Sequence, residues 1–368
     1  MTRYLLAGGG TAGHVNPLLA VAERLRERDA AASVLVLGTR EGLESRLVPE
    51  RGIELVTVAR LPFPRKPGRA LIAFPRKLRA LVTEIYDLIV AREIDVVVGF
   101  GGYVSAPAYL AARRARVPIV IHEANAVPGL ANRLGARYTR FVGVAFEGTK
   151  LPHATVVGMP LRREIEQLDR ARSRAHALTV LGLAPEKPVL LVTGGSLGAQ
   201  RINDAVNEAS ANLVGAGWQL FHIVGERSSL RNSGLPGYHI LAYSDRMDLA
   251  FSAADLVVAR AGSATVSEVT ALGLPAVYVP LAIGNGEQRR NARAVVAAGG
   301  ALLVEDRDFT ASWIVDELVP LLQRPAEIAS MAAIASSIGT RAGTDNTVAL
   351  IDDALRADGA QRSRRGHP

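Results

Sequence analysis

His14 is the residue of this sequence best suited to act as a base. It closes the glycine-rich segment GGGTAGH, Gly8 to His14, which follows the apolar run Tyr4–Ala7. Glycines at a strand-to-helix turn let backbone amides approach a ligand, and an imidazole can accept a proton near neutral pH. A histidine at a helix start can also bond only to backbone, so the residues alone leave both roles open.

A second glycine-rich segment, GGSLGA, runs from Gly194 to Ala199 after the apolar run Val189–Thr193. Its amides and the Ser196 hydroxyl form a candidate diphosphate site, because the start of a helix favours an anion. Two such segments predict two similarly built halves with a ligand cleft between them.

Two polar segments of the second half, Arg260–Glu268 and Gly284–Asn291, each follow an apolar run. The carboxylate of Glu268 can pair with the two neighbouring hydroxyls of a ribose. Gln288 and Asn291 can hydrogen-bond sugar hydroxyls without adding charge. A helix-capping acid and a solvated loop are the simpler interpretations of these two segments.

A nicotinamide dinucleotide is disfavoured as a ligand. A dinucleotide-binding fold carries a ribose-binding acid at the end of its second strand. Here that strand ends in Leu37-Gly38-Thr39-Arg40, and Glu41 and Glu44 come late and beside arginines. The first glycine-rich segment therefore does not predict a dehydrogenase.

Strand and helix patterns alternate along both halves, and the expected strands are nearly continuous apolar runs. This pattern predicts an α/β protein with doubly wound parallel sheets. A length of 368 residues suits two domains. We expect domains at residues 1–160 and 161–340, a helix at about 341–356 that packs back on the first domain, and a disordered tail from residue 357.

The composition excludes several other classes of protein. The chain has no cysteine, so thiolate chemistry and disulfides are excluded. No apolar stretch approaches the eighteen residues of a transmembrane helix, and the first glycine-rich segment leaves no room for a signal peptide. We therefore expect a cytoplasmic protein.

The excess positive charge lies in the first half: residues 1–160 hold 22 Lys and Arg against 13 Asp and Glu. Within Leu61–Arg79 the basic residues have no acidic neighbours and alternate with apolar ones, which suits an anionic membrane surface. A solvated basic loop is the alternative, and nucleic acid fits less well because no aromatic stacking platform accompanies the charge. The expected membrane-facing residues are Arg65, Lys66, Arg69, Leu71, Ile72, Phe74, Arg76, Lys77 and Arg79.

Seven motifs follow one another in a characteristic order. They are GGTAGHVNP (Gly9–Pro17), GGYVSAP (Gly101–Pro107), HEANAVPG (His122–Gly129), GMPLR (Gly158–Arg162), GGSLGAQRIN (Gly194–Asn203), GSATVSE (Gly262–Glu268) and NGEQRRNA (Asn285–Ala292). With these motifs the sequence resembles the MurG family, bacterial transferases that add N-acetylglucosamine (GlcNAc) to lipid I. The resemblance implies a GT-B fold, two Rossmann-like domains that bind UDP-GlcNAc mainly through the C-terminal one.

The resemblance also implies roles for individual residues. His14 is the expected catalytic base. The first loop is expected to serve the acceptor diphosphate, the Ser196 loop the leaving UDP, the backbone near Ser244 the uracil and Glu268 the ribose. The residues implied to contact UDP-GlcNAc are Thr11, Ala12, Gly13, Asn125, Arg162, Ser196, Ser244, Ser263, Ala264, Thr265, Val266, Ser267, Glu268 and Gln288.

The implied reaction is inverting transfer of GlcNAc to the C4 hydroxyl of undecaprenyl-pyrophosphoryl-MurNAc-pentapeptide (lipid I), giving lipid II without a metal or other cofactor. Such an enzyme works at the cytoplasmic face of the cell membrane as a peripheral protein, beside other proteins of cell-wall synthesis and division. Ala12, Ala124, Ala261 and Glu287 depart from the usual family pattern. The alternatives are a glycolipid synthase, a UDP-GlcNAc 2-epimerase and a non-catalytic nucleotide-sugar-binding protein.

Overall fold

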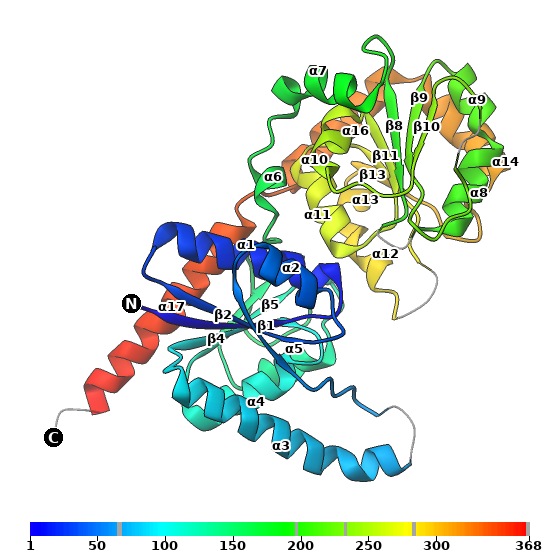
Figure 1. Cartoon of the computed structure of the whole chain (residues 1–368). Coiled ribbons are helices and arrows are strands. Elements are labelled where there is room, and N and C mark those ends of the chain that lie inside the picture. Colours follow the sequence, from blue (N-terminus) through cyan, green and yellow to red (C-terminus); the bar gives the residue numbers. More distant parts are fainter. Residues whose placement is uncertain (65–67, 196–197, 232–233, 282–284, 366–368) are drawn as a thin grey trace. The chain divides into compact units, whose positions relative to one another are not determined.

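Two parallel β-sheets organise the chain, one in each of two compact units (Figure 1). The computed structural model describes residues 1–64, 68–195, 198–231, 234–281 and 285–365, without the side chains of residues 69 and 361–365. Unit 1 comprises Met1–Arg162 and the residues from Arg341 on, and unit 2 comprises Arg163–Thr340. The prediction of an α/β fold with two doubly wound parallel sheets is confirmed.

The sheet of unit 1 has the strand order β3-β2-β1-β4-β5-β6-β7, and every neighbouring pair is parallel. Its central strands are apolar and buried on both faces, as expected for a parallel sheet covered by helices. The strands are β1 (Arg3–Gly8), β2 (Ser33–Thr39), β3 (Glu54–Val58), β4 (Val96–Gly101), β5 (Ile119–Glu123), β6 (Phe141–Val144) and β7 (Ala154–Val156).

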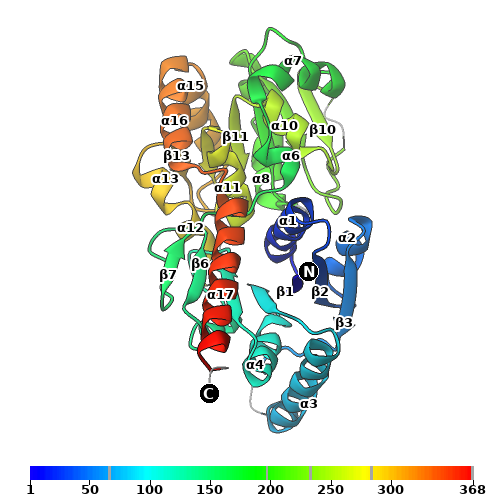
Figure 2. The ribbon, with the colours of Figure 1, turned by 90° about the vertical axis from the view of Figure 1, so that its left-hand side faces the viewer.

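Helices cover both faces of this sheet, because successive side chains of each strand point to opposite sides. Leu5 packs into the core under α3 and α4, and its neighbour Leu6 packs into the core under α1 and α17. Helices α3 and α4 therefore cover one face of the sheet, and α1 and α17 cover the other (Figure 2). The helices of unit 1 are α1 (Ala12–Arg28), α2 (Glu44–Glu50), α3 (Arg69–Ala91), α4 (Ser105–Ala115), α5 (Leu130–Gly135) and α17 (Gly343–Arg365).

The last helix, α17, is fastened to α1 by two ion pairs, Arg28 with Asp352 at 2.5 Å and Arg24 with Asp345. Its core-facing Ile351 is fully buried. The sequence predicts a disordered tail from residue 357, whereas the structure continues the helix to Arg365. The Ala, Gln and Arg residues of this stretch favour a helix, and each adds to a helix that is already nucleated.

Helix α3 also begins earlier than the sequence suggests. The apolar pattern of the sequence predicts a helix over Leu78–Ala91, and the structure extends it nine residues toward the N-terminus, to Arg69, with Pro75 inside it. Phe63, just before the helix, packs edge-to-face on Phe74 with ring centroids 5.3 Å apart. Among the helices that the structure describes, none combines the length and apolar character needed to cross a membrane.

The sheet of unit 2 has the strand order β10-β9-β8-β11-β12-β13 and is also parallel throughout. Helices α8, α9 and α16 and the π-helical turn η1 enclose one core, while α7 and α10 pack together on the other side. The strands are β8 (Val189–Thr193), β9 (Gln219–Ile223), β10 (Tyr238–Leu241), β11 (Leu256–Ala259), β12 (Ala276–Tyr278) and β13 (Ala301–Leu303). The helices are α6 (Arg163–Glu166), α7 (Arg170–Leu181), α8 (Gln200–Glu208), α9 (Ser210–Gly215), α10 (Met247–Ala253), α11 (Ser263–Ala271), α12 (Glu287–Asn291), α13 (Arg293–Ala297), α14 (Ala311–Trp313), η1 (Ile314–Leu318), α15 (Val319–Leu322) and α16 (Pro325–Ile338).

Each sheet reverses its strand order at one point, between β1 and β4 in unit 1 and between β8 and β11 in unit 2. Ligands of open α/β sheets bind at such switch points, beyond the carboxyl ends of the strands. Both glycine-rich segments follow the first strand of their sheet, β1 or β8. The fold therefore sets each of them at the switch point of its own unit.

The histidines His122 and His222 are both fully buried. Because of them, we expect the free energy of unfolding to decrease at acidic pH. Burial lowers the pKa of His122, in unit 1, to about 4 and that of His222, in unit 2, to about 3. Unfolding returns each imidazole to its usual value near 6.5, so below that pH the unfolded chain binds more protons than the folded one. Stability therefore falls as the pH decreases from 6.5, by about 1.4 kcal/mol per pH unit for each histidine.

Urea unfolding between pH 7.5 and 5.0 checks this prediction. Below pH 6.5, we expect the unfolding free energy of the H122Q variant to fall less steeply with decreasing pH than that of the wild type. The difference should be about 1.4 kcal/mol per pH unit, the contribution of one histidine. The exposed His153 provides the control, because an H153N variant leaves both buried imidazoles in place. Equal slopes in wild type and H122Q would contradict the assignment.

Candidate active site

In unit 1 the loops that follow β1 and β4 lie against each other at the switch point. The hydroxyl of Ser105 lies 3.0 Å from the Ala7 carbonyl and accepts the Gly101 amide at 3.1 Å, which ties the ends of the two strands together. A Cβ atom on Gly102 would lie 2.6 Å from the Gly9 carbonyl oxygen. Glycine at position 102 is therefore required for the loops to approach this closely.

His14, at the start of α1, is held by the loop that contains it. Its Nδ1 lies 3.2 Å from the Gly9 carbonyl oxygen and 3.3 Å from the Thr11 hydroxyl. A carbonyl only accepts hydrogen bonds, so Nδ1 carries the proton that it shares with Gly9, and Nε2 of the neutral ring is the acceptor. The ring lies over Gly101, where a Cβ atom would come within 3.0 Å of Nε2. This half-buried imidazole therefore presents Nε2 as its hydrogen-bond acceptor.

The loop 124–129 is organised by the buried carboxylate of Glu123, which is 2 % exposed. Its two oxygens accept the backbone amides of Asn125 and Gly129, each at 2.9 Å. Asn132 donates to the same carboxylate at 3.0 Å and accepts the Tyr109 hydroxyl at 2.7 Å. Burial, with a smaller contribution from the Glu123 charge, raises the pKa of Tyr109, so this phenol stays a hydrogen-bond donor. Asn125 therefore stands on a loop of fixed shape.

In unit 2, α11 begins directly beyond β11 at the switch point. Its nine residues include the candidate nucleotide-binding run from Ser263 to Glu268. Ser263, Val266 and Glu268 are buried, whereas the other three residues of the run are half-buried. Val266 is 2 % exposed, and its backbone amide donates to the Gly262 carbonyl at 2.9 Å.

The loops around α11 are fastened by side chains of α12. Gln288 accepts the Leu281 amide at 2.9 Å through its side-chain oxygen, so its NH₂ group is the part able to donate to a sugar hydroxyl. Asn291 donates to the Ala261 carbonyl at 3.2 Å. Ser244, beyond β10, accepts the Arg246 amide at 3.2 Å, which closes a short turn.

A buried hydrogen-bond network joins α8, the helix that follows the second glycine-rich segment, to β9 and β10. His222 bonds Asn203 of α8 through Nε2 at 3.0 Å and the Tyr238 hydroxyl through Nδ1 at 2.9 Å. Asn203 also donates to the Val224 carbonyl at 2.9 Å, and a Cβ on Gly198 would overlap that same carbonyl. The first turn of α8 and the end of β9 are thereby locked together.

The two carboxylates of one acidic segment of unit 2, Asp306 and Asp308, do not belong to this arrangement. The carboxylates of the Asp306-Arg307-Asp308 sequence are paired with arginines, since Asp306 meets Arg260 at 2.5 Å and Arg201 at 3.3 Å and Asp308 lies 3.5 Å from Arg307. Across the described part of the chain, no three His, Asp or Glu side chains are grouped as metal ligands would be.

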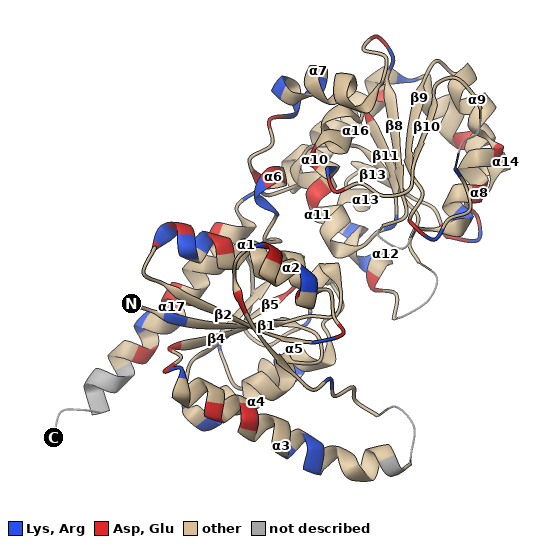
Figure 3. Cartoon of the chain, in the orientation of Figure 1, with Lys and Arg blue, Asp and Glu red and all other residues tan. Residues whose placement is uncertain are grey.

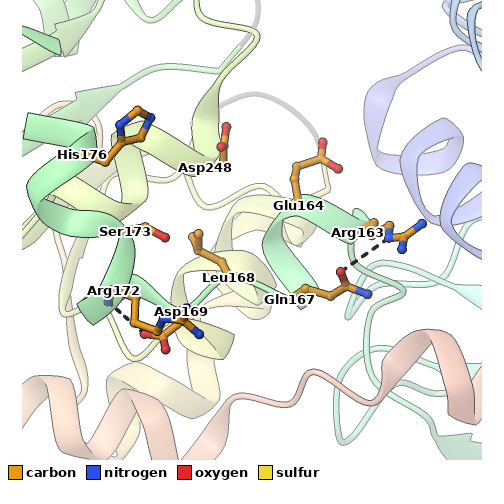
Figure 4. A pocket seen from close by; sticks show the side chains of 9 residues that line it. All are labelled: Arg163, Glu164, Gln167, Leu168, Asp169, Arg172, Ser173, His176 and Asp248. Atoms are coloured by element: carbon orange, nitrogen blue, oxygen red, sulfur yellow. Dashed lines mark hydrogen bonds between the residues drawn. The ribbon is translucent and has the colours of Figure 1, made fainter. Parts of the chain in front are cut away.

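A hollow of about 710 Å³ lies between α6, α7 and α10, and its lining includes charged side chains of both signs (Figure 4). The Arg246 guanidinium bonds the Asp248 carboxylate at its edge and holds the pKa of that group below its usual value. None of the residues singled out from the sequence lines this hollow. Its lining residues are Arg163, Glu164, Gln167, Leu168, Asp169, Arg172, Ser173, His176 and Asp248.

Comparison with known proteins decides the family. Residues 4–144 match the glycosyltransferase family 28 N-terminal domain, and residues 189–346 match the glycosyltransferase family 28 C-terminal domain. The chain is 62% identical, over 97% of its length and 100% of the relative's, to the UDP-N-acetylglucosamine–N-acetylmuramyl-(pentapeptide) pyrophosphoryl-undecaprenol N-acetylglucosamine transferase of Leifsonia xyli subsp. xyli. The chain belongs to the MurG family. The similarly named protein of Clavibacter sepedonicus is 57% identical over 96% of this MurG-family chain and 97% of its own length.

Solved structures agree with this membership. The crystal structure of Acinetobacter baumannii MurG superposes with a TM-score of 0.79 at 28% identity, covering 96% of this MurG-family chain and all of the other. The UDP-GlcNAc 2-epimerase of Neisseria meningitidis, bound to UDP-GlcNAc, superposes with a TM-score of 0.68 at 14% identity, covering 96% and 100%. The second likeness concerns the fold alone.

Within each unit of this MurG-family enzyme the candidate residues gather beyond the carboxyl ends of the strands. Thr11, Ala12, Gly13 and His14 follow β1 and Asn125 follows β5, while Arg162 is the last residue before unit 2. In unit 2 the candidates follow β10, β11 and β12. Ser196 lies outside the described residues, as do Arg65 and Lys66 and the side chain of Arg69.

Sequence reasoning missed three buried side chains that shape the loops. Glu123 and Asn203 lie inside motifs that were recognised, but their partners are set by the tertiary structure. Glu44 is 0 % exposed and was considered only as a ribose-binding acid. Its position five residues beyond β2, shortly after glycines 38 and 42, was the available signal that the side chain is enclosed.

Proposed function

We propose that this chain transfers GlcNAc from UDP-GlcNAc to the C4 hydroxyl of lipid I, with inversion at the sugar C1 and formation of a β-1,4 bond. The observation that carries this proposal is the 62% identity to the Leifsonia xyli transferase over that protein's whole length. The switch-point loops of both units supply groups of the kinds that the reaction needs.

The first chemical requirement is a base for the acceptor. In the proposed mechanism Nε2 of His14 takes the proton of the C4 hydroxyl while the oxygen forms its bond to C1 of GlcNAc. The Gly9 carbonyl, 3.2 Å from Nδ1, stabilises the imidazolium that results. Loop 124–129, shaped by Glu123, presents Asn125 to the GlcNAc.

The second requirement is stabilisation of the leaving group. The bond between C1 and the diphosphate oxygen breaks, and the charge that develops falls on UDP. Amides of the second glycine-rich segment and the N-terminal end of α8 are assigned to this charge. Ser263–Glu268 hold the nucleotide, with Glu268 on the ribose, and the Gln288 amide group donates to sugar hydroxyls.

Transfer of radiolabel from UDP-GlcNAc to a lipid I analogue tests the proposal. We expect a disaccharide-linked lipid product to form only when the acceptor is present. An epimerase would convert UDP-GlcNAc without an acceptor, and a non-catalytic binding protein would release no UDP in either case. Either of those results would remove the transferase assignment.

We assign the start of α3 to a membrane surface, at which the enzyme meets its lipid-linked acceptor on the cytoplasmic face. Leu71 and Ile72 are 43 % and 82 % exposed, and Phe63 is 58 % exposed. Arg76, Lys77 and Arg79 follow on the same helix, with the acidic residues further along it (Figure 3). Apolar side chains beside cations are typical of a peripheral site on anionic lipid.

An I72D variant is expected to lower partitioning onto anionic lipid vesicles by about 10-fold to 150-fold, because inserting one isoleucine contributes about 1.5–3 kcal/mol. Cosedimentation with vesicles of anionic and of neutral lipid measures this effect. Val90, 54 % exposed near the other end of α3, supplies the matched control V90D. Equal losses in I72D and V90D would remove the assignment of this surface.

A further inference from the structure

The carboxylate of Glu44 lies directly beneath the glycine-rich segment that ends in His14. It is the first residue of α2, and no part of its side chain reaches solvent. Its Oε2 accepts the Gly10 amide at 2.8 Å, across 34 residues of sequence. Its Oε1 accepts both the amide of Thr39 at 2.8 Å and the hydroxyl of Thr39 at 2.9 Å.

Three glycines leave the space that this carboxylate fills. A Cβ atom on Gly9, Gly38 or Gly42 would overlap the Glu44 side chain. Gly9 belongs to the first glycine-rich segment, Gly38 to β2 and Gly42 to the turn before α2. Three separate segments of the chain therefore enclose the Glu44 carboxylate: the loop after β1, the end of β2 and the turn before α2.

Burying a carboxylate is costly unless its oxygens are hydrogen-bonded. Here both oxygens accept hydrogen bonds, one from the Gly10 loop and one from the end of β2, so the group is satisfied as an anion. The Gly10 amide, which donates to this carboxylate, is one of the backbone donors with which a glycine-rich turn of this kind binds a phosphate. Gly10 therefore already has an internal anion as its partner.

We propose that Glu44 is a positioning residue for the proposed transfer: it fixes the backbone of Gly8–His14 and thereby His14, and it excludes a phosphate from Gly10. This inference rests on the function proposed above. It also alters the expectation that the first loop serves the acceptor diphosphate.

The E44Q variant keeps the shape of the side chain but turns one acceptor into a donor, facing either Gly10 or Thr39. We expect kcat to fall about 100-fold, because small displacements of a base cost about that much, while the KM for UDP-GlcNAc changes less than threefold. The exposed Glu41 gives the control E41Q. The buried Val48 of the same helix gives V48A, which loosens α2 but keeps the carboxylate.

Hydrogen exchange gives a readout that does not depend on transfer. Amides of the peptide covering residues 8–14 should exchange at least tenfold faster in E44Q than in V48A. In E44A, formate should fill the vacated site, slow this exchange again and restore part of kcat, and it should have neither effect in V48A. If E44A does not fold, E44Q and V48A carry the comparison.

Activity of E44Q within threefold of E41Q would overturn the proposal. Equal changes of kcat and of loop exchange in E44Q and V48A would also overturn it, since they would indicate general loosening of α2. A folded E44A whose exchange and kcat do not respond to formate would have the same meaning. Failure of the proposed function is seen separately, as absence of transfer by the wild-type protein, and the exchange experiment still reports on Glu44.

Discussion

Replacing His14 by alanine is expected to lower kcat for GlcNAc transfer by about 10²–10⁴-fold, the usual contribution of a positioned general base. The expectation follows from the orientation of the ring. The contact of Nδ1 with the Gly9 carbonyl leaves Nε2 as the proton acceptor, and the ring lies over Gly101. The KM for UDP-GlcNAc should change little, since the proposed nucleotide contacts belong to unit 2. Steady-state kinetics with a lipid I analogue measure both constants.

Two further variants separate the base from a merely structural histidine. H14Q keeps a polar side chain of similar length, but its amide group cannot take up a proton as the imidazole does. It should therefore be as impaired as H14A. H153N alters the exposed His153 of the same unit and should behave as wild type. Normal turnover in H14A with intact UDP-GlcNAc binding would remove the base assignment.

Much of the fold follows from local patterns in the sequence. The apolar runs that became β1, β4 and β8 are recognisable because parallel strands are buried on both faces. A glycine-rich turn directly after such a strand marks the switch point of the sheet. For the same reason the sequence alone assigns the candidate residues of each unit to one edge of its sheet.

What remained hidden depends on contacts between distant segments. Glu44 is separated from Gly10 by 34 residues, and in the sequence it was weighed only as a ribose-binding acid. The His222 network joins β9, β10 and α8, so no local window contains its three members. The start of α3 was missed because Pro75 weakens the helical pattern, while packing of Phe63 on Phe74 favours an ordered segment there.

Both units hold their glycine-rich segments with buried polar side chains, but in different ways. In unit 1 a carboxylate bonds the amide of Gly10 itself. In unit 2 the neutral Asn203 bonds a carbonyl of the neighbouring loop. On the proposal above, the anion at the first segment repels phosphate, whereas the Asn203 contact described at the second carries no charge. This difference favours UDP at the second segment and the acceptor hydroxyl near the first.

Replacing Glu268 by alanine is expected to raise the KM for UDP-GlcNAc about 10-fold to 150-fold, with kcat changed less than threefold. Glu268 lies on α11 beyond β11 and is 7 % exposed, so a hydrogen bond from a ribose hydroxyl to its carboxylate is shielded from water. Hydrogen bonds to a charged group contribute about 1.5–3 kcal/mol, which corresponds to this change in affinity. Contacts to a ribose, remote from C1, are equally strong in the ground state and the transition state, so their loss acts on KM.

The E268Q variant tests the charge separately, because it keeps an acceptor oxygen and should retain part of the affinity. E317A, at an exposed glutamate of the same unit, controls for the loss of a surface charge. Thermal unfolding with and without UDP gives a second measure, in which UDP should stabilise E268A less than wild type. A fall in kcat at unchanged KM would place Glu268 at the reacting atoms and contradict its assignment to the ribose.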